Sequence, residues 1–196
     1  MKKNHNLNPN LNSKDSEIVL ELKTPIGPMT ARIGARGLSA LRFPAPGEQV
    51  LTDRADAPVT LVGQAPPEGH PDFSPGLLRV ADAVSAWLSA FFAGRPLPEP
   101  PALDFSGASE FERRVWQATR EIPAGETRSY GQIAARIGRP GATRAVGGAL
   151  GRNPLVLLVP CHRVIASGGG SRRLCGFTAG LALKEYLLDL ETRVRC

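Results

Sequence analysis

The chain of 196 residues has few cysteines and no long apolar stretch, and each scarcity excludes a class of protein. Its three cysteines, Cys161, Cys175 and Cys196, are odd in number and lack zinc-ligand spacing. A disulfide framework is therefore not expected, and a reducing, cytoplasmic location is the default. No apolar run reaches the roughly 18 residues needed to span a membrane. Residues 1–16, rich in Asn and Lys, lack the apolar core of a secretion signal and predict a disordered tail.

Negative charge is scarce in the second half of the chain. Residues 107–196 contain 14 Lys and Arg against 7 Asp and Glu, whereas residues 1–106 contain 10 against 11. The whole net charge of +6 therefore comes from the second half. This distribution is typical of a domain that meets nucleic-acid phosphates, although a merely soluble basic surface would give the same count.

The first half of the chain predicts a small domain over residues 17–95. Short apolar runs separated by Pro and Gly turns predict an antiparallel β-meander over residues 17–43. Residues 44–75, rich in Pro, Gly and acids, predict an irregular loop, and helical apolar spacing predicts a helix over residues 77–93. A Pro-rich linker, residues 96–108, then marks the expected domain boundary.

The second domain, residues 109–196, is predicted to be mostly helical, which makes the fold class α+β. Ser109, followed three residues later by a glutamate, predicts a capping box at the start of a helix. Ser129 can cap a short helix over residues 130–137, and a glycine-containing turn leads into a second helix over residues 142–150. Two short helices joined in this way predict a helix-turn-helix.

A cysteine follows the all-apolar segment 155–159, which predicts a buried strand. Only about 3% of an ordinary thiol is thiolate at neutral pH, and a neighbouring imidazole raises that fraction. Adjacent side chains of an extended segment point opposite ways, so we expect a water between Cys161 and His162. A carboxylate of the last helix, Glu185 or Glu191, would fix the histidine tautomer. The alternative is that Cys161 is only a small buried apolar residue.

The segment 142–150 consists largely of small residues and contains two glycines, each costing ~1 kcal/mol in a helix relative to alanine. Small side chains would let this helix enter the DNA minor groove, which is about 6 Å wide. Its single arginine could then fill the gap left by an extruded base. Close packing against another helix inside the protein would explain the same residues.

Several motifs together resemble one family, the O6-alkylguanine-DNA alkyltransferases, also called methylated-DNA–protein-cysteine methyltransferases. The resemblance covers residues 109–191 strongly and residues 24–43 weakly. The matching segments are Trp116, Ile122-Pro123-Ala124-Gly125-Glu126, Ser129-Tyr130-Gly131-Gln132-Ile133-Ala134, Arg144-Ala145-Val146-Gly147-Gly148-Ala149, Asn153-Pro154, Pro160-Cys161-His162-Arg163-Val164-Ile165 and Gly180-Leu181-Ala182-Leu183-Lys184-Glu185.

The resemblance implies DNA repair by direct reversal. The alkyl group of an O6-alkylguanine in double-stranded DNA would pass to the protein once and irreversibly, with O4-alkylthymine left open as a second substrate. It also implies a ribonuclease H-like topology for the first domain, a monomeric protein, and neither cofactor nor membrane association. The zinc ligands of some relatives have no match in the first half, so no metal is expected.

The same resemblance implies roles for the residues at matching positions. Cys161 would be the alkyl acceptor, His162 the base that deprotonates it through water, and Glu191 the carboxylate that orients the histidine. Asn153 would brace the turn that holds the cysteine. Tyr130 would protonate N3 of the departing guanine and help to rotate its phosphate.

Further matching positions concern DNA and the substrate pocket. Arg144 would replace the flipped nucleotide in the base stack. The helix face in the minor groove would comprise Ala142, Thr143, Ala145 and Gly147. The pocket walls would comprise Val164, Phe177, Thr178 and Ala179.

Departures from the family pattern concern the pocket above all. Phe177 replaces the usual tyrosine, Ala179 the usual glycine, and Thr143 a common alanine, and the loop 166–175 is longer than usual. Three alternatives stay open on the residues alone. They are an alkylated-base-binding protein without an acceptor, an alkylation-sensing helix-turn-helix regulator, and a hydrolase with a Cys-His-Glu site. The thiol at position 161 argues against the first.

Overall fold

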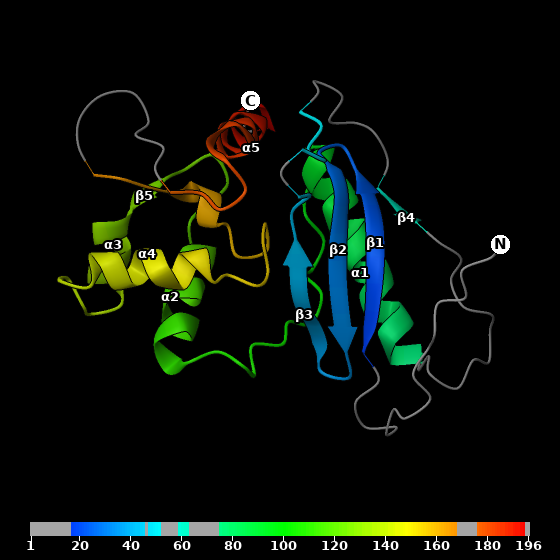
Figure 1. The fold of residues 1–196 in the computed structure, drawn as a ribbon, viewed down its shortest axis with the longest axis horizontal. Coiled ribbons are helices and arrows are strands. Elements are labelled where there is room, and N and C mark those ends of the chain that lie inside the picture. Colours follow the sequence, from blue (N-terminus) through cyan, green and yellow to red (C-terminus); the bar gives the residue numbers. More distant parts are fainter. Residues whose placement is uncertain (1–16, 46, 52–58, 63–74, 168–175, 195–196) are drawn as a thin grey trace.

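A computed structural model describes residues 17–45, 47–51, 59–62, 75–167 and 176–194. It contains a mixed α/β fold in which a four-stranded antiparallel sheet and helix α1 lie beside a cluster of helices built from the second half of the chain (Figure 1). The predicted tail, the loop 166–175 beyond Ser167, Cys175, Cys196 and most of the predicted loop 44–75 lie outside the described residues.

The predicted meander is confirmed. Strands β1 (Ile18–Thr24), β2 (Gly27–Gly34) and β3 (Gly37–Arg42) pair antiparallel in chain order. The prediction of an irregular loop over 44–75 is wrong at one point, because Thr60–Val62 forms strand β4 on the outer edge of β1, with Leu61 opposite Leu22. Three residues are too short to give a periodic signal, and the free edge of β1 supplies the pairing.

Helix α1 (Pro75–Phe92) agrees with the predicted helix over 77–93 and packs on one face of the sheet (Figure 1). Its buried positions recur at helical spacing, which explains both the helix and its docking. The buried residues are Leu77, Ala81, Val84, Trp87, Leu88, Ala90, Phe91 and Phe92.

Local capping determines where two helices of the second half begin. Ser109 caps α2 (Glu110–Arg120) and Ser129 caps α3 (Tyr130–Arg136), each with both hydrogen bonds of a capping box. A turn leads from α3 into α4 (Thr143–Gly151), and the indole of Trp116 on α2 donates to the carbonyl of Ala149 on α4 at 2.9 Å. Helices α2, α3 and α4 therefore form one packed unit.

The last helix, α5 (Leu181–Val194), lies beyond a short parallel pair formed by β5 (Arg128–Ser129) and β6 (Val164–Ile165). None of the helices in the described part of the chain is long and apolar enough to cross a membrane.

The prediction of a strand over residues 155–159 is wrong, although the segment is largely buried. It forms tight turns, in which Val159 N donates to Leu155 O at 2.8 Å and Leu157 adopts a left-handed φ of 68°. Cys161–Arg163 then forms one turn of 3-10 helix (η1), so the cysteine and histidine do not lie in an extended segment. The apolar residues predicted burial correctly, but not the backbone shape, because the segment turns back on itself after a single bridge between Leu155 and Leu41 of β3.

The edge of β3 that faces away from β2 forms backbone hydrogen bonds with two segments. One precedes α2 and the other is the turn before Cys161. Leu38 exchanges backbone hydrogen bonds with Ala102 and Asp104 at 2.8 and 2.9 Å. Leu41 N donates to Pro154 O at 2.7 Å, and Leu41 O accepts from Val156 N at 3.2 Å. The buried apolar side chains of both halves accordingly belong to one continuous core.

Candidate functional site

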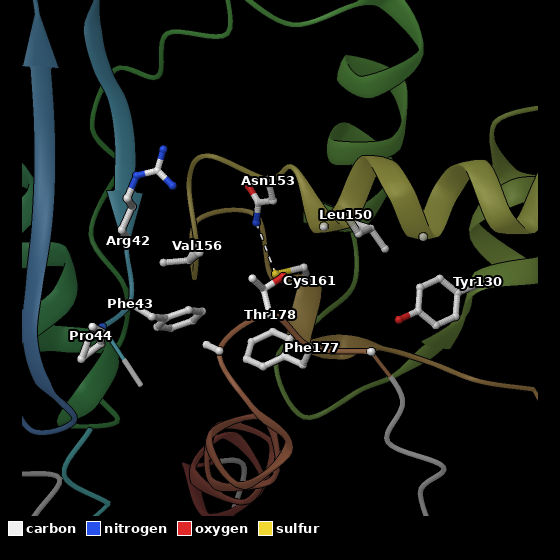
Figure 2. Close-up of a pocket in the computed structure, with 15 residues that line it drawn as sticks. Arg42, Phe43, Pro44, Tyr130, Leu150, Asn153, Val156, Cys161, Phe177 and Thr178 are labelled. Atoms are coloured by element: carbon white, nitrogen blue, oxygen red, sulfur yellow. Dashed lines mark hydrogen bonds between the residues drawn. The ribbon is translucent and has the colours of Figure 1, made fainter. Parts of the chain in front are cut away.

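A cavity of about 260 Å³ lies between the two halves of the chain, and Cys161 is one of its walls (Figure 2). The turn η1 carries Cys161, which is half-buried as a residue. The lining residues are Arg42, Phe43, Pro44, Ala45, Tyr130, Gly147, Leu150, Gly151, Asn153, Val156, Cys161, Gly176, Phe177, Thr178 and Ala179.

Asn153 braces the turn that carries the cysteine. Its Oδ1 accepts from Leu155 N at 2.9 Å, and its Nδ2 donates to Val159 O at 2.8 Å. The same Nδ2 lies 3.3 Å from Cys161 Sγ and donates to it (Figure 2). One amide therefore fixes the turn and also offers a hydrogen bond that stabilises negative charge on sulfur.

Behind the cysteine, His162 and Glu191 form a buried pair. His162 is wholly buried, and its Nε2 lies 2.8 Å from Glu191 Oε1. Its Nδ1 has no hydrogen-bond partner among the described residues. Of the two carboxylates considered from the sequence, Glu191 contacts the histidine, whereas Glu185 is exposed.

Glu191 also accepts from groups that the sequence did not point to. The buried guanidinium of Arg163 donates to both carboxylate oxygens at 2.7 to 3.1 Å, and Gly125 N donates to Oε2 at 3.1 Å. Burial alone would raise the pKa of Glu191, but the bonds from His162 and Arg163 outweigh it and lower that pKa to about 2. The carboxylate is therefore ionised at neutral pH and holds the imidazole in one orientation.

The thiol and the imidazole both have shifted pKa values. Burial raises the pKa of Cys161, against the hydrogen bond from Asn153 and the positive charge of Lys184. Burial also lowers the pKa of His162, against the attraction of Glu191. Both shifts favour the neutral forms of the two side chains, so a thiolate at Cys161 would require transfer of the thiol proton to a base.

Lys184 is a second buried cation that sequence reasoning passed over. It is wholly buried, its Nζ donates to Val164 O at 2.6 Å, and the ammonium lies 5.7 Å from the ring centroid of Phe177. The sequence signal that could have identified Lys184 is its position in the segment Gly180–Glu185, which matches the family pattern. A fixed positive charge near the sulfur favours the thiolate.

Tyr130 lies at the other end of the cavity, against α4 (Figure 2). A Cβ built on Gly147 would lie 3.8 Å from the tyrosine ring, so the helix passes close to it. Thr143, Arg144 and Ala145 are exposed on the outer face of α4, and Ala142 is half-buried at its N-terminus. Of α4, only Gly147, Leu150 and Gly151 are among the residues that line the cavity.

The predicted pocket walls are placed in part. Phe177, Thr178 and Ala179 line the cavity, but Val164 does not. Val164 is wholly buried because strand β6, to which it belongs, pairs with β5 in the core. Its carbonyl is bound by Lys184 rather than open to the cavity.

The segment Arg42–Ala45 at the end of β3 lines the cavity, although the sequence did not predict it as part of the site. It carries no chemical motif, and only the packing of the two halves brings it beside Cys161. Within the described residues, no three His, Cys, Asp or Glu side chains gather closely enough to hold a metal ion.

Comparison with known proteins assigns this architecture to a family. The family model for the DNA-binding domain of 6-O-methylguanine DNA methyltransferase matches residues 110–193. A methylated-DNA–protein-cysteine methyltransferase of Mycolicibacterium paratuberculosis is 56% identical over 106 residues, which cover 54% of this chain and 62% of the relative. The enzyme of the same name from Methanosarcina acetivorans is 50% identical over 108 residues, covering 55% and 67%. The chain thus matches less than two thirds of the first of these relatives in sequence.

The structural match extends further. The crystal structure of Mycobacterium tuberculosis O6-methylguanine methyltransferase aligns with 90% of this chain and 93% of its own, at 34% identity and a TM-score of 0.65. The Mycobacterium tuberculosis OGT in complex with DNA aligns with 89% and 92%, at 36% identity and a TM-score of 0.63. The chain belongs to the family of the methylated-DNA–protein-cysteine methyltransferases.

Proposed function

We propose that this protein repairs DNA by direct reversal, moving an alkyl group from O6 of guanine in a duplex to Cys161. One observation carries the proposal. The Cys161 sulfur faces a cavity that borders the small-residue surface of α4, with the buried pair of His162 and Glu191 behind it. The names of the relatives and the DNA-bound structure of one of them support the same activity.

The arrangement allows a single displacement. A water between Cys161 and Nδ1 of His162 would carry the thiol proton to the imidazole, which Glu191 stabilises once charged. The thiolate attacks the alkyl carbon, the bond between carbon and the guanine oxygen breaks, and a thioether forms. Tyr130 donates a proton to N3 of the leaving guanine, a general-acid contribution of about 10²–10⁴-fold. The thioether has no further leaving group, so the protein reacts once.

The surface of α4 suits the DNA side of this reaction. Helices α3 and α4 would act as a helix-turn-helix, with Ala142, Thr143, Ala145 and Gly147 in the minor groove. Arg144, exposed on this face, would occupy the place of the flipped nucleotide. Flipping costs a few kcal/mol, and phosphate contacts from the basic half would offset it.

We extend the proposal to the rest of the molecule by the same family likeness. The sheet and α1 would correspond to the ribonuclease H-like unit of the family, and the protein would act in the cytoplasm. It would act as a monomer, which is supported by a cavity around Cys161 that one chain lines by itself.

Mass spectrometry after incubation with O6-methylguanine duplex tests the proposal. We expect a gain of one methyl group per protein, mapped to the peptide that carries Cys161. Cys161→Ser should abolish this gain and still bind the duplex, while Cys196→Ser serves as a matched control that keeps it.

The same experiment separates the other candidate functions. An alkylated-base-binding protein would bind the duplex and gain no mass. A hydrolase would release more than one product per protein molecule. An alkylation-sensing regulator would gain the same methyl group, so a second measurement is needed: deleting it should leave the removal of O6-methylguanine from bulk DNA in cells unchanged.

A further inference from the structure

One wall of the cavity comes from the sheet half of the protein. Phe43 and Pro44, which follow β3, line it together with Val156, and all three lie on the far side of Cys161 from Tyr130 (Figure 2). Phe43 is half-buried and Pro44 buried. The sulfur therefore lies between two parts of the cavity, one beside α4 and one beside β3.

The two parts would receive different portions of the substrate. A flipped base that comes from DNA bound at α4 enters on the side of Tyr130. Its O6 substituent must place the first carbon at the sulfur for displacement to occur. A methyl group ends there, whereas the further atoms of a larger group point sideways from the line of sulfur, carbon and oxygen, and Phe43, Pro44 and Val156 line the cavity beside the sulfur.

This wall is held in place by contacts with the loop before α5. The ring of Phe43 lies 5.6 Å from the ring of Phe177, tilted by 58°. Gln49 Nε2 donates to Ala179 O at 2.9 Å. The wall is thus prearranged, so little ordering free energy is spent when a group binds against it.

We propose that Phe43, with its neighbours in the segment Arg42–Ala45, is a specificity-determining element that binds the distal part of apolar O6 substituents larger than methyl. The inference rests on the proposed function and names its substrate class as aryl and longer alkyl adducts. Contact with the aromatic face of Phe43 stabilises the transition state for these groups and not for methyl.

Single-turnover rates on two matched duplexes test the inference, one carrying O6-benzylguanine and the other O6-methylguanine at the same position. Removing the apolar contact in Phe43→Ala should slow benzyl transfer about tenfold while methyl transfer changes less than twofold. Phe43→Leu keeps most of the apolar volume, so its rate of benzyl transfer should lie between those of the unaltered protein and Phe43→Ala. This variant carries the test if Phe43→Ala does not fold.

Val19→Ala provides the matched control, since Val19 is an exposed apolar residue of β1 that does not line the cavity. Its two rates should equal those of the unaltered protein. An equal fall in both rates, or a faster benzyl transfer, in the Phe43 variants would overturn the inference and leave the proposed function standing. No transfer of either group by the unaltered protein would overturn both.

Discussion

Glu191 connects three separate parts of the chain at the site. Its two oxygens accept from His162, Arg163 and the backbone of Gly125, all within 3.1 Å. The carboxylate therefore links the last helix to the turn that carries Cys161 and to the segment after α2. Its ionisation matters for the fold as well as for the orientation of the imidazole.

A pH dependence of stability follows for this residue. The folded-state pKa of Glu191 is about 2, below the ordinary value of 4.5. Its contribution to the free energy of unfolding is therefore complete above about pH 4.5 and is lost as the pH falls toward 2. Urea denaturation at pH 6, 4 and 3 should show stability falling through this window.

Glu191→Gln checks the assignment. Without the charge, Arg163 loses its buried counter-ion and His162 its ionised hydrogen-bond acceptor, so stability at neutral pH should fall by about 3 kcal/mol, as when a buried ion pair is broken. The dependence on pH between 4.5 and 2 should weaken at the same time. A variant with an unchanged acid profile would show that the acid sensitivity arises elsewhere; Glu185→Gln, on the exposed side of α5, is the control.

At the scale of elements, the burial pattern of α4 bears on its small residues, for which the sequence allowed either entry into the DNA minor groove or packing against another helix. Val146, Ala149 and Leu150 are buried, but Thr143, Ala145 and Gly148 are exposed. Apart from the helix's own backbone, only the flexible end of Arg152 lies within 4 Å of a Cβ built on Gly148 among the described residues. Packing inside the protein thus does not explain the exposed small residues. Contact of these residues with DNA stays a prediction.

Ala145→Leu tests that contact. The position is exposed, so leucine should leave the free energy of unfolding within about 0.5 kcal/mol. We expect binding to duplex DNA to weaken about tenfold, as a larger side chain is forced into a groove about 6 Å wide. Alkylation by the free base O6-benzylguanine should be unaffected, and an equal loss with free base and duplex would contradict a groove role.

The elements also show which sequence signals were sufficient. Ser109 and Ser129 marked helix starts correctly because a capping box depends on only four consecutive residues. The segment 155–159 was assigned a strand wrongly because apolar side chains report burial and not backbone shape. Leu157 in a left-handed conformation has no counterpart in any local pattern.

At the scale of the whole molecule, charge is distributed unevenly between the two halves. The excess of positive charge lies in residues 107–196, and exposed arginines such as Arg139, in the turn before α4, belong to it. Arg32, in the first half, is exposed as well but lies 3.6 Å from the carboxylate of Glu17. Long-range attraction to DNA should therefore come from one side of the molecule.

The salt dependence of duplex binding checks this asymmetry. Each phosphate contact contributes about −0.9 to the slope of log K against log salt concentration. Arg139→Ala should make the slope shallower by about one such contact, and Arg32→Ala should leave it unchanged. Equal slopes for the two variants would contradict a DNA surface confined to the second half.

The whole molecule also explains which parts of the site were beyond prediction. Cys161, His162 and Asn153 are close in sequence, and the structure places them together as a motif predicts. Phe43 contacts Phe177 only because the two halves of the chain pack together, so the local sequence around Phe43 does not predict its place in the cavity.

The pairing of Leu41 with Pro154 and Val156 limits how relatives of this protein can be recombined. A chimera that takes its sheet from one homologue and its helices from another has to reproduce a hydrogen-bonded edge that ends at Val156, five residues before Cys161. Changes in β3 and in the turn 154–156 are thus not independent. A mismatch between these two segments would displace Cys161 even if all the residues around it were unchanged. An exchange between homologues should therefore replace β3 and the turn 154–156 together.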